Sequence, residues 1–319
     1  MITKYQELAK NGNVRPSGFV SSVAVILYFY LFIGTIIASI PMIYILITNR
    51  DSIFDPIMQT DPVGFFAKYI GPIPNFIFTN LTIISMLIGA VIAIKFIHNR
   101  PFGTVFNYTG KIKWSNFWIG FGVFGIILFA GTAVDYIFNS DAYTISFEPT
   151  KFFVLLPLIL IMTPIQATTE EIVFRGYIIQ SLGLKVKNGI VLSVISGVLF
   201  TLPHLSNPEI YAANELGLFS TICMALNYYV FGMMMAMLTI RTNSLEAAAG
   251  VHVVNNLFSF IVVSYPDSVL PTNSIFFTSE LNPVGGLVTS IITSILFYLI
   301  AVFIIEKTDK TLKTTLNNL

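Results

Sequence analysis

Two adjacent carboxylates, Glu170 and Glu171, stand directly after the apolar run 152–167. Only 10% of the residues are Asp, Glu, Lys or Arg, so neighbouring acidic residues beside such a run are unusual for this chain. A charged side chain at the centre of a membrane helix costs about 2.5–3.5 kcal/mol on insertion scales, and adjacent carboxylates also repel each other. We therefore predict that the pair has a chemical role.

Two histidines and an asparagine are further candidates for the same site. His204 ends the apolar run 189–203, and His252 lies in a later apolar run with Asn256 four residues on. Residues i and i+4 share one face of a helix, so His252 and Asn256 are expected to point toward the same spot. The third histidine, His98, stands in a basic loop, where a solvated side chain is expected.

The neighbours of the two glutamates predict different roles for them. If a helix begins at Thr168, that residue can cap it and Glu171 can complete a capping box. Glu171 also stands four residues before Arg175, which is the favourable order for a helical ion pair. Both arrangements use Glu171 and neither uses Glu170. We therefore predict a structural Glu171 and a chemically free Glu170.

A carboxylate, two imidazoles and an amide suit hydrolysis by an activated water molecule. A glutamate beside a histidine can hold a water and take its proton. A second histidine and an asparagine can donate hydrogen bonds to an oxyanion. The same side chains could instead ligate zinc, but the HExxH signature is absent and the candidates form no compact ligand motif. We expect no bound metal, with zinc as the alternative.

The composition predicts the scaffold that must position these residues. The chain of 319 residues is 55% apolar, with a mean hydropathy of +0.79, which excludes an ordinary soluble domain. Crossing a bilayer takes about 18–20 apolar residues. This predicts an all-α, polytopic integral membrane protein with about eight transmembrane helices, the first of them bent at Pro41. The uncharged segments are 17–49, 69–94, 115–134, 152–169, 188–208, 216–240, 247–266 and 281–305.

The distribution of charge predicts the orientation and excludes some partners. Cytoplasmic segments are enriched in Lys and Arg. With a cytoplasmic N-terminus, only Arg50, Lys68 and Lys151 of the 17 basic residues fall on the opposite side, and both termini are then cytoplasmic. A net charge of +1 with scattered basic residues gives no nucleic-acid-binding patch. The single cysteine, Cys223, excludes a disulfide framework.

Three short motifs resemble those of the CPBP family, which contains the type II CAAX prenyl proteases and the bacteriocin-processing Abi proteins. The motifs are EExxxR at 170–175, FxxxH at 200–204 and HxxxN at 252–256, in that order. The resemblance covers about residues 150–260. It divides the chain into transmembrane helices without a motif (1–149), a catalytic core (150–265), and a last helix with a cytoplasmic tail (266–319).

The resemblance implies an intramembrane endopeptidase whose cavity opens to the cytoplasm and to lipid. Glu246 departs from the family pattern, and we interpret it as harmless or as a contact with the substrate. The implied site consists of Glu170 and His204, which activate water, His252 and Asn256, which hold the oxyanion, and the supporting residues Glu171, Arg175 and Phe200.

Two other classes of function stay open at this point. One is a catalytically silent membrane scaffold or bacteriocin-immunity protein of the same fold. The other is a proton-coupled transporter, for which we find no matching motif in the first half of the chain. Abundant Lys, Ile and Asn favour a bacterial origin and hence the plasma membrane. The expected partners are the lipid bilayer and a peptide or membrane-protein substrate.

Overall fold

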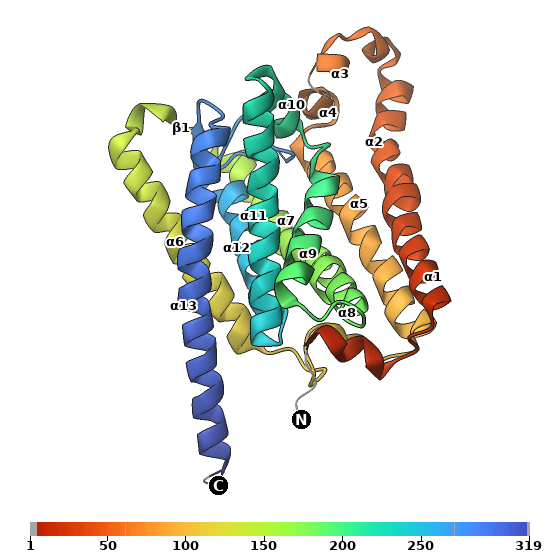
Figure 1. The fold of residues 1–319 in the computed structure, drawn as a ribbon. Coiled ribbons are helices and arrows are strands. Elements are labelled where there is room, and N and C mark those ends of the chain that lie inside the picture. Colours follow the sequence, from red (N-terminus) through yellow and green to blue (C-terminus); the bar gives the residue numbers. More distant parts are fainter. Residues whose placement is uncertain (1–4, 61, 271, 318–319) are drawn as a thin grey trace.

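The computed structural model describes residues 5–60, 62–270 and 272–317. Most of them lie in helices (Figure 1), which confirms the predicted all-α polytopic membrane fold. The α-helices are α1 (Pro16–Leu27), α2 (Gly34–Thr48), α3 (Ile57–Thr60), α4 (Pro62–Ile70), α5 (Pro72–Ile92), α6 (Trp114–Phe138), α7 (Pro149–Glu171), α8 (Ile179–Leu182), α9 (Gly189–His204), α10 (Pro208–Glu215), α11 (Leu218–Thr242), α12 (Glu246–Ile261) and α13 (Pro283–Asn317). The 3-10 and π-helical segments are η1 (Tyr5–Asn11), η2 (Tyr28–Ile33), η3 (Arg50–Phe54), η4 (Ala93–Ile97), η5 (Phe102–Val105), η6 (Ser140–Ala142) and η7 (Ile172–Ile178).

The number of membrane-crossing helices is the point on which the structure differs from the sequence prediction. The described residues contain six stretches long and apolar enough to cross a membrane, and a seventh if α9 and α10, bent by 83° at their junction, form one span. The predicted segment 247–266 corresponds to α12, which has only 16 residues and is not among these spans. The six stretches are Pro16–Thr48, Pro72–Ile97, Trp114–Phe138, Pro149–Leu182, Leu218–Thr242 and Pro283–Asp309.

The helix of the first of these spans does not end at Pro41, where the sequence predicts a bend. Pro41 lies inside α2, and Pro16–Thr48 forms a single span. The irregularity of the backbone lies earlier, at the π-helical segment η2. A π-helical turn disturbs a helix without any proline, so the local proline signal did not locate it.

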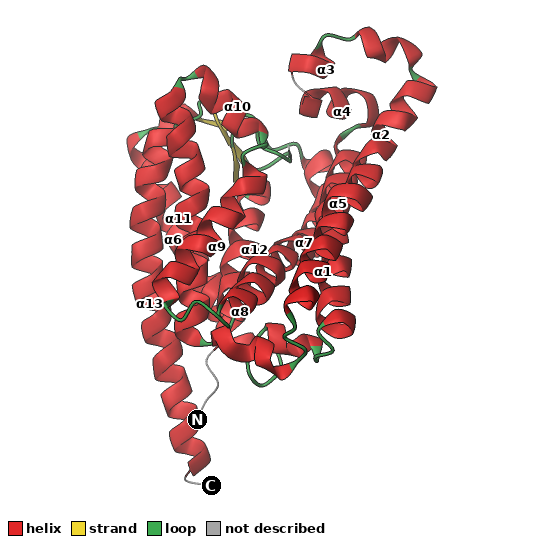
Figure 2. Ribbon diagram, turned by 45° about the vertical axis from the view of Figure 1, so that its right-hand side comes forward, coloured by secondary structure: helices red, strands yellow, loops and turns green. Residues whose placement is uncertain are grey.

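Two flanks of helices enclose a central group. α1, α2 and α5 pack together on one flank, and α13 contacts both α6 and α11 on the other (Figure 2). Between the flanks lie α7, α9 and α12, where α12 contacts α6, α7 and α11, and α9 contacts α11. The three helices of the central group, with η7 directly after α7, contain all three sequence motifs.

The two ends of the bundle carry different elements. η1 and the end of α13 lie at one end, and α3, α4 and α10 lie at the other (Figure 1). A small sheet near the second end has the strand order β1–β3–β2, with β1 antiparallel and β2 parallel to β3. It joins the connection after α6 to the connection after α12. The strands are β1 (Tyr143–Ile145), β2 (Val263–Ser264) and β3 (Phe276–Thr278).

Glycines let α12 approach α6 closely. A Cβ atom on Gly120 would lie 2.1 Å from the carbonyl oxygen of Ala247, and one on Gly250 would lie 2.1 Å from the carbonyl oxygen of Phe117. Carbon and oxygen atoms cannot approach so closely without a bond, so any larger residue would push the helices apart. Because α12 carries His252, this helix contact also sets the position of a candidate catalytic residue.

Gly120→Ala is expected to destabilise the protein by about 1–3 kcal/mol, because the added methyl group must displace α12 from α6. Gly122→Ala is a matched control on the same helix, since a Cβ atom there meets nothing within 4 Å. Alanine is also the better helix former, by about 1 kcal/mol. Thermal unfolding of both proteins in detergent measures the difference, and equal midpoints would contradict the close contact.

His98 is buried, and the prediction of a solvated side chain is wrong. It is only 4% exposed, and its Nε2 lies 3.1 Å from the Ser22 hydroxyl and 3.0 Å from the Tyr177 hydroxyl. Its Nδ1 donates to the carbonyl oxygen of Asn13 at 2.6 Å. Burial lowers the pKa of His98 below its usual value. His98 is therefore a neutral structural residue that fastens the segment after η1 to the bundle.

Candidate active site

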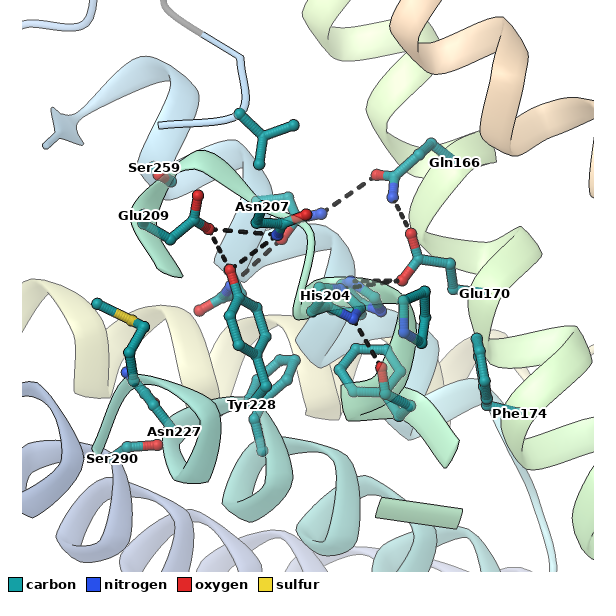
Figure 3. Close-up of a pocket in the computed structure, with 18 of the residues that line it drawn as sticks. Gln166, Glu170, Phe174, His204, Asn207, Glu209, Asn227, Tyr228, Ser259 and Ser290 are labelled. Carbon is teal, nitrogen blue, oxygen red and sulfur yellow. Dashed lines mark hydrogen bonds and ion pairs between the residues drawn. The ribbon is translucent and has the colours of Figure 1, made fainter. Parts of the chain in front are cut away.

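A cavity of about 1890 Å³ lies between the two flanks. Its walls come from α1, α5, α6, α7, α9, α11, α12 and α13, and Figure 3 shows part of its lining. The four residues predicted to be catalytic all line it: Glu170, His204, His252 and Asn256. Side chains that are distant in the sequence therefore line one half-open cavity.

Glu170 and Glu171 are the last two residues of α7, and the π-helical segment η7 follows without a break. Thr168 lies well inside this helix, which begins at Pro149, so the predicted capping box is wrong. Segments of π-helix occur frequently at functional sites. Here the change of helix type falls directly after the two candidate carboxylates.

The predicted ion pair between Glu171 and Arg175 is confirmed. Arg175 Nη1 lies 2.9 Å from Glu171 Oε1, and both side chains are completely buried. Arg175 also donates from Nη2 to the carbonyl oxygen of Gly232 at 3.0 Å and lies over the Phe200 ring, 4.2 Å from its centroid. A Cβ atom on Gly232 would come within 2.9 Å of that ring. The motif residues Arg175 and Phe200 thus pack together, with Phe200 lining the cavity and Arg175 behind it.

Glu170 has one oxygen that is engaged and one that is not. Its Oε1 accepts a hydrogen bond from the amide of Gln166, one helical turn earlier. Its Oε2 has no hydrogen-bond partner and lies 3.9 Å from Nε2 of His204 and 3.9 Å from Nε2 of His252. These separations are too long for direct hydrogen bonds. The carboxylate and both imidazoles therefore face a common point inside the cavity.

His204 is held in a defined orientation at the end of α9. Its Nδ1 donates to the carbonyl oxygen of Phe200 at 2.7 Å, which assigns the proton to Nδ1 and leaves the lone pair on Nε2. The ring lies between two aromatic rings, Phe200 at 4.4 Å and Tyr228 at 4.5 Å between centroids. Nε2 is therefore positioned to accept a proton or a hydrogen bond on the side of Glu170.

His252 and Asn256 share one face of α12, as the spacing predicts. His252 Nδ1 lies 2.8 Å from Oε1 of Glu171, so the ion pair of Glu171 also fixes the imidazole ring. Asn256 donates to Oε1 of Gln166 at 3.2 Å. Since one amide hydrogen makes this bond, the second is available to another acceptor in the cavity.

Four residues near the site were missed by the sequence analysis: Gln166, Asn207, Glu209 and Tyr228. Gln166 links the carboxylate of Glu170 to the amide of Asn256, and its i, i+4 spacing to Glu170 was a usable signal. The other three form hydrogen bonds among themselves across the junction of α9, α10 and α11. No local spacing in the sequence connects them to His204.

Glu246 supports the fold instead of the substrate. It is 2% exposed and stands at the first position of α12. Its carboxylate accepts hydrogen bonds from Asn107, from the Ser244 hydroxyl and from the backbone N–H of Lys113. It does not line the cavity. The interpretation of Glu246 as a substrate contact is therefore wrong, and it joins the start of α12 to the loop before α6.

The donor atoms of the site do not form a metal-binding set. Within the part of the chain that the structure describes, no group of three or more His, Cys, Asp or Glu side chains is arranged to hold a metal ion. Asn256 and Gln166 are bonded to each other instead of facing a common ligand position.

Comparisons with known proteins agree with this geometry. A family model described as type II CAAX prenyl endopeptidase Rce1-like matches residues 151–258, a range that contains every candidate catalytic residue. The chain is also similar to protein YyaK of Bacillus subtilis (strain 168), with 31% identity over 223 residues, which cover 69% of this chain and 72% of that protein. No solved structure matches the chain.

Proposed function

Since the chain belongs to the Rce1-like family of type II CAAX prenyl endopeptidases, a family of proteases, we propose that it is an active intramembrane endopeptidase. Its substrate would be a membrane-associated peptide or protein, which enters the cavity between the two flanks of helices. We place it in a bacterial plasma membrane, with the end that carries η1 and the C-terminal part of α13 in the cytoplasm. The bias of basic residues and the similarity to a Bacillus protein support this placement.

One observation carries the proposal. Glu170 Oε2 is buried, has no hydrogen-bond partner and faces Nε2 of both histidines at 3.9 Å. A water molecule held between Glu170 and His204 would satisfy these atoms and be activated by them. Glu171 Oε2 also lacks a partner, so the argument depends on the position of Glu170 Oε2 between the two imidazoles.

The reaction follows from the positions of the proton acceptors. Glu170 Oε2 takes a proton from the water as the water oxygen attacks the carbonyl carbon of the scissile peptide bond. The C–N bond then breaks, and the same proton passes to the amide nitrogen of the leaving group. His204 orients the water through Nε2, because its Nδ1 is committed to the backbone.

The oxyanion that forms in this step requires hydrogen-bond donors. Asn256 has one free amide hydrogen that can donate to the oxyanion. Nε2 of His252 faces the same part of the cavity, and it could donate only in a doubly protonated ring, because Nδ1 donates to Glu171. Removing one such donor typically slows a hydrolase by about 10²–10³. Glu171 and Arg175 hold the His252 ring in place, and Gln166 does the same for Asn256.

The proposal predicts metal-independent cleavage. Peptide termini are mapped in membranes of cells that make either wild type or Glu170→Gln. New termini that appear only with wild type identify candidate substrates. Purified wild type in liposomes should then cleave a synthetic peptide spanning such a site, and treatment with a chelator should leave the rate unchanged. The opposite result would be activity that disappears with the chelator and returns with added Zn²⁺, together with about one equivalent of metal by elemental analysis. It would contradict activation of the water by Glu170 and His204 alone and would indicate a metalloprotease mechanism.

A further inference from the structure

Glu209, on α10, is a second buried carboxylate in the wall of the cavity. It is 1% exposed. Its Oε1 accepts hydrogen bonds from the Tyr228 hydroxyl and from Asn207 at 3.3 Å, whereas its Oε2 has no hydrogen-bond partner. Figure 3 shows the side chain beside Asn207 and Tyr228, with one oxygen directed away from both. The proposed hydrolysis makes no use of this carboxylate.

The engaged oxygen of Glu209 has only neutral partners. Tyr228 and Asn207 supply dipoles and no positive charge, and among the described residues Glu209 forms no ion pair. A buried carboxylate without a counterion is costly, and such groups usually pair with cations or mark a functional site. A positive group brought in by a ligand would complete the environment of Oε2.

Tyr228 connects this carboxylate directly to the candidate active site. Its ring contacts His204 in a tilted arrangement, with 4.5 Å between centroids, while its hydroxyl donates a hydrogen bond to Glu209. The distance between His204 and Glu209 is therefore about one tyrosine side chain. An extended peptide advances roughly 3.3–3.6 Å per residue. If a peptide binds with its scissile bond beside His204, the group that reaches Glu209 would belong to a residue a few positions from that bond.

The charges along the cavity give a bound peptide a preferred direction. The basic residues of its lining, Lys10 and Lys185, come from η1 and the connection after α8, at one end. Asp135, Glu209 and Glu280 line the opposite end, where α10 and the small sheet lie (Figure 1). This polarity favours a positive group at the α10 end.

We infer that Glu209, with Asn207 and Tyr228, forms a subsite for a cationic group of the substrate, a primary ammonium or a guanidinium, within roughly one to three residues of the scissile bond. This inference rests on the proposed function, because it assigns the cavity to a peptide. It makes the enzyme selective for a Lys, an Arg or a free N-terminus at one position. The buried carboxylate recognises the charge, and Tyr228 fixes its distance from His204.

Binding tests this inference without any cleavage. The probes are fluorescent palmitoylated alanine pentapeptides with a single lysine at each of the five positions in turn, and the same peptides with norleucine in place of lysine. The protein is Glu170→Gln in lipid nanodiscs, and affinity is measured by fluorescence anisotropy. One lysine position should bind roughly ten- to a hundredfold more tightly than its norleucine counterpart, as for a charge-assisted hydrogen bond. Adding Glu209→Gln, which keeps an acceptor for Tyr228, should abolish that preference.

Two further variants separate a loss of charge from a loss of fold. Glu215→Gln removes an exposed glutamate from the same helix and should leave the lysine preference intact. Tyr228→Phe removes the hydroxyl and keeps the Glu209 charge, so the preference should persist. Equal affinity for lysine and norleucine at every position, including no measurable binding of either, overturns the inference, as does a preference that survives Glu209→Gln. If the preference is found but wild type cleaves nothing, the proposed protease activity fails and the cationic subsite stands.

Discussion

Glu170→Gln should lower kcat by roughly 10²–10⁴, the usual contribution of a positioned general base. Glutamine keeps the size of the side chain and an oxygen that accepts from Gln166. It removes the basic oxygen that faces both histidines. Because the water is not part of the substrate, KM should change little. The effect is measured as the rate at which the purified protein in liposomes cleaves a synthetic peptide that spans a cleavage site identified by mapping new termini.

Two controls give this result its meaning. Glu215→Gln changes an exposed carboxylate on α10 and should retain full activity. Glu171→Gln should lose stability and part of the activity, because Glu171 holds both Arg175 and His252. A fully active Glu170→Gln together with a well-folded, inactive Glu171→Gln would exchange the roles of the two glutamates.

Arg175→Met is expected to destabilise the protein by about 3–5 kcal/mol, because it leaves the Glu171 carboxylate buried without its ionic partner. Both side chains of this pair are completely buried, so water cannot compensate for the loss. Methionine retains much of the volume that packs on Phe200. Denaturant-induced unfolding in mixed micelles, followed by circular dichroism, measures the change.

The exposed ion pair between Arg241 and Glu306 is the matched comparison. Its atoms lie 2.6 Å apart, but the two side chains are 56% and 40% exposed. Arg241→Met should therefore change stability by no more than about 1 kcal/mol. Combining Arg175→Met with Glu171→Gln should be less destabilising than Arg175→Met alone, since no buried charge then remains. A double variant less stable than both single ones would show that packing, and not charge, dominates at this pair.

Helical periodicity explains which parts of the site could be predicted from the sequence. The pairing of Glu171 with Arg175 and the common face of His252 and Asn256 depend only on the i, i+4 spacing of a regular helix. The composition likewise indicates an all-helical membrane protein, because uncharged segments of sufficient length have few alternatives. These predictions needed no information about how the helices pack.

Features that depend on packing could not be predicted in this way. Thr168 has the local signature of a cap, but the helix already extends from Pro149, so no helix end exists there. His98 is buried because Asn13, far away in the sequence, bonds its ring. The contact of Tyr228 with His204 and Glu209 depends on the 83° turn between α9 and α10. The pair Asn207-Pro208 signals a turn at this point, but no short-range pattern encodes its angle.

The size of the cavity also bears on the second reactant of hydrolysis. A peptide bond inside a bilayer is surrounded by hydrocarbon, where water is scarce. A volume of about 1890 Å³ corresponds to room for on the order of sixty water molecules at about 30 Å³ each. A short peptide would displace only part of this volume. If the protein hydrolyses a peptide as proposed, the water that it consumes would come from this cavity and not from the surrounding hydrocarbon.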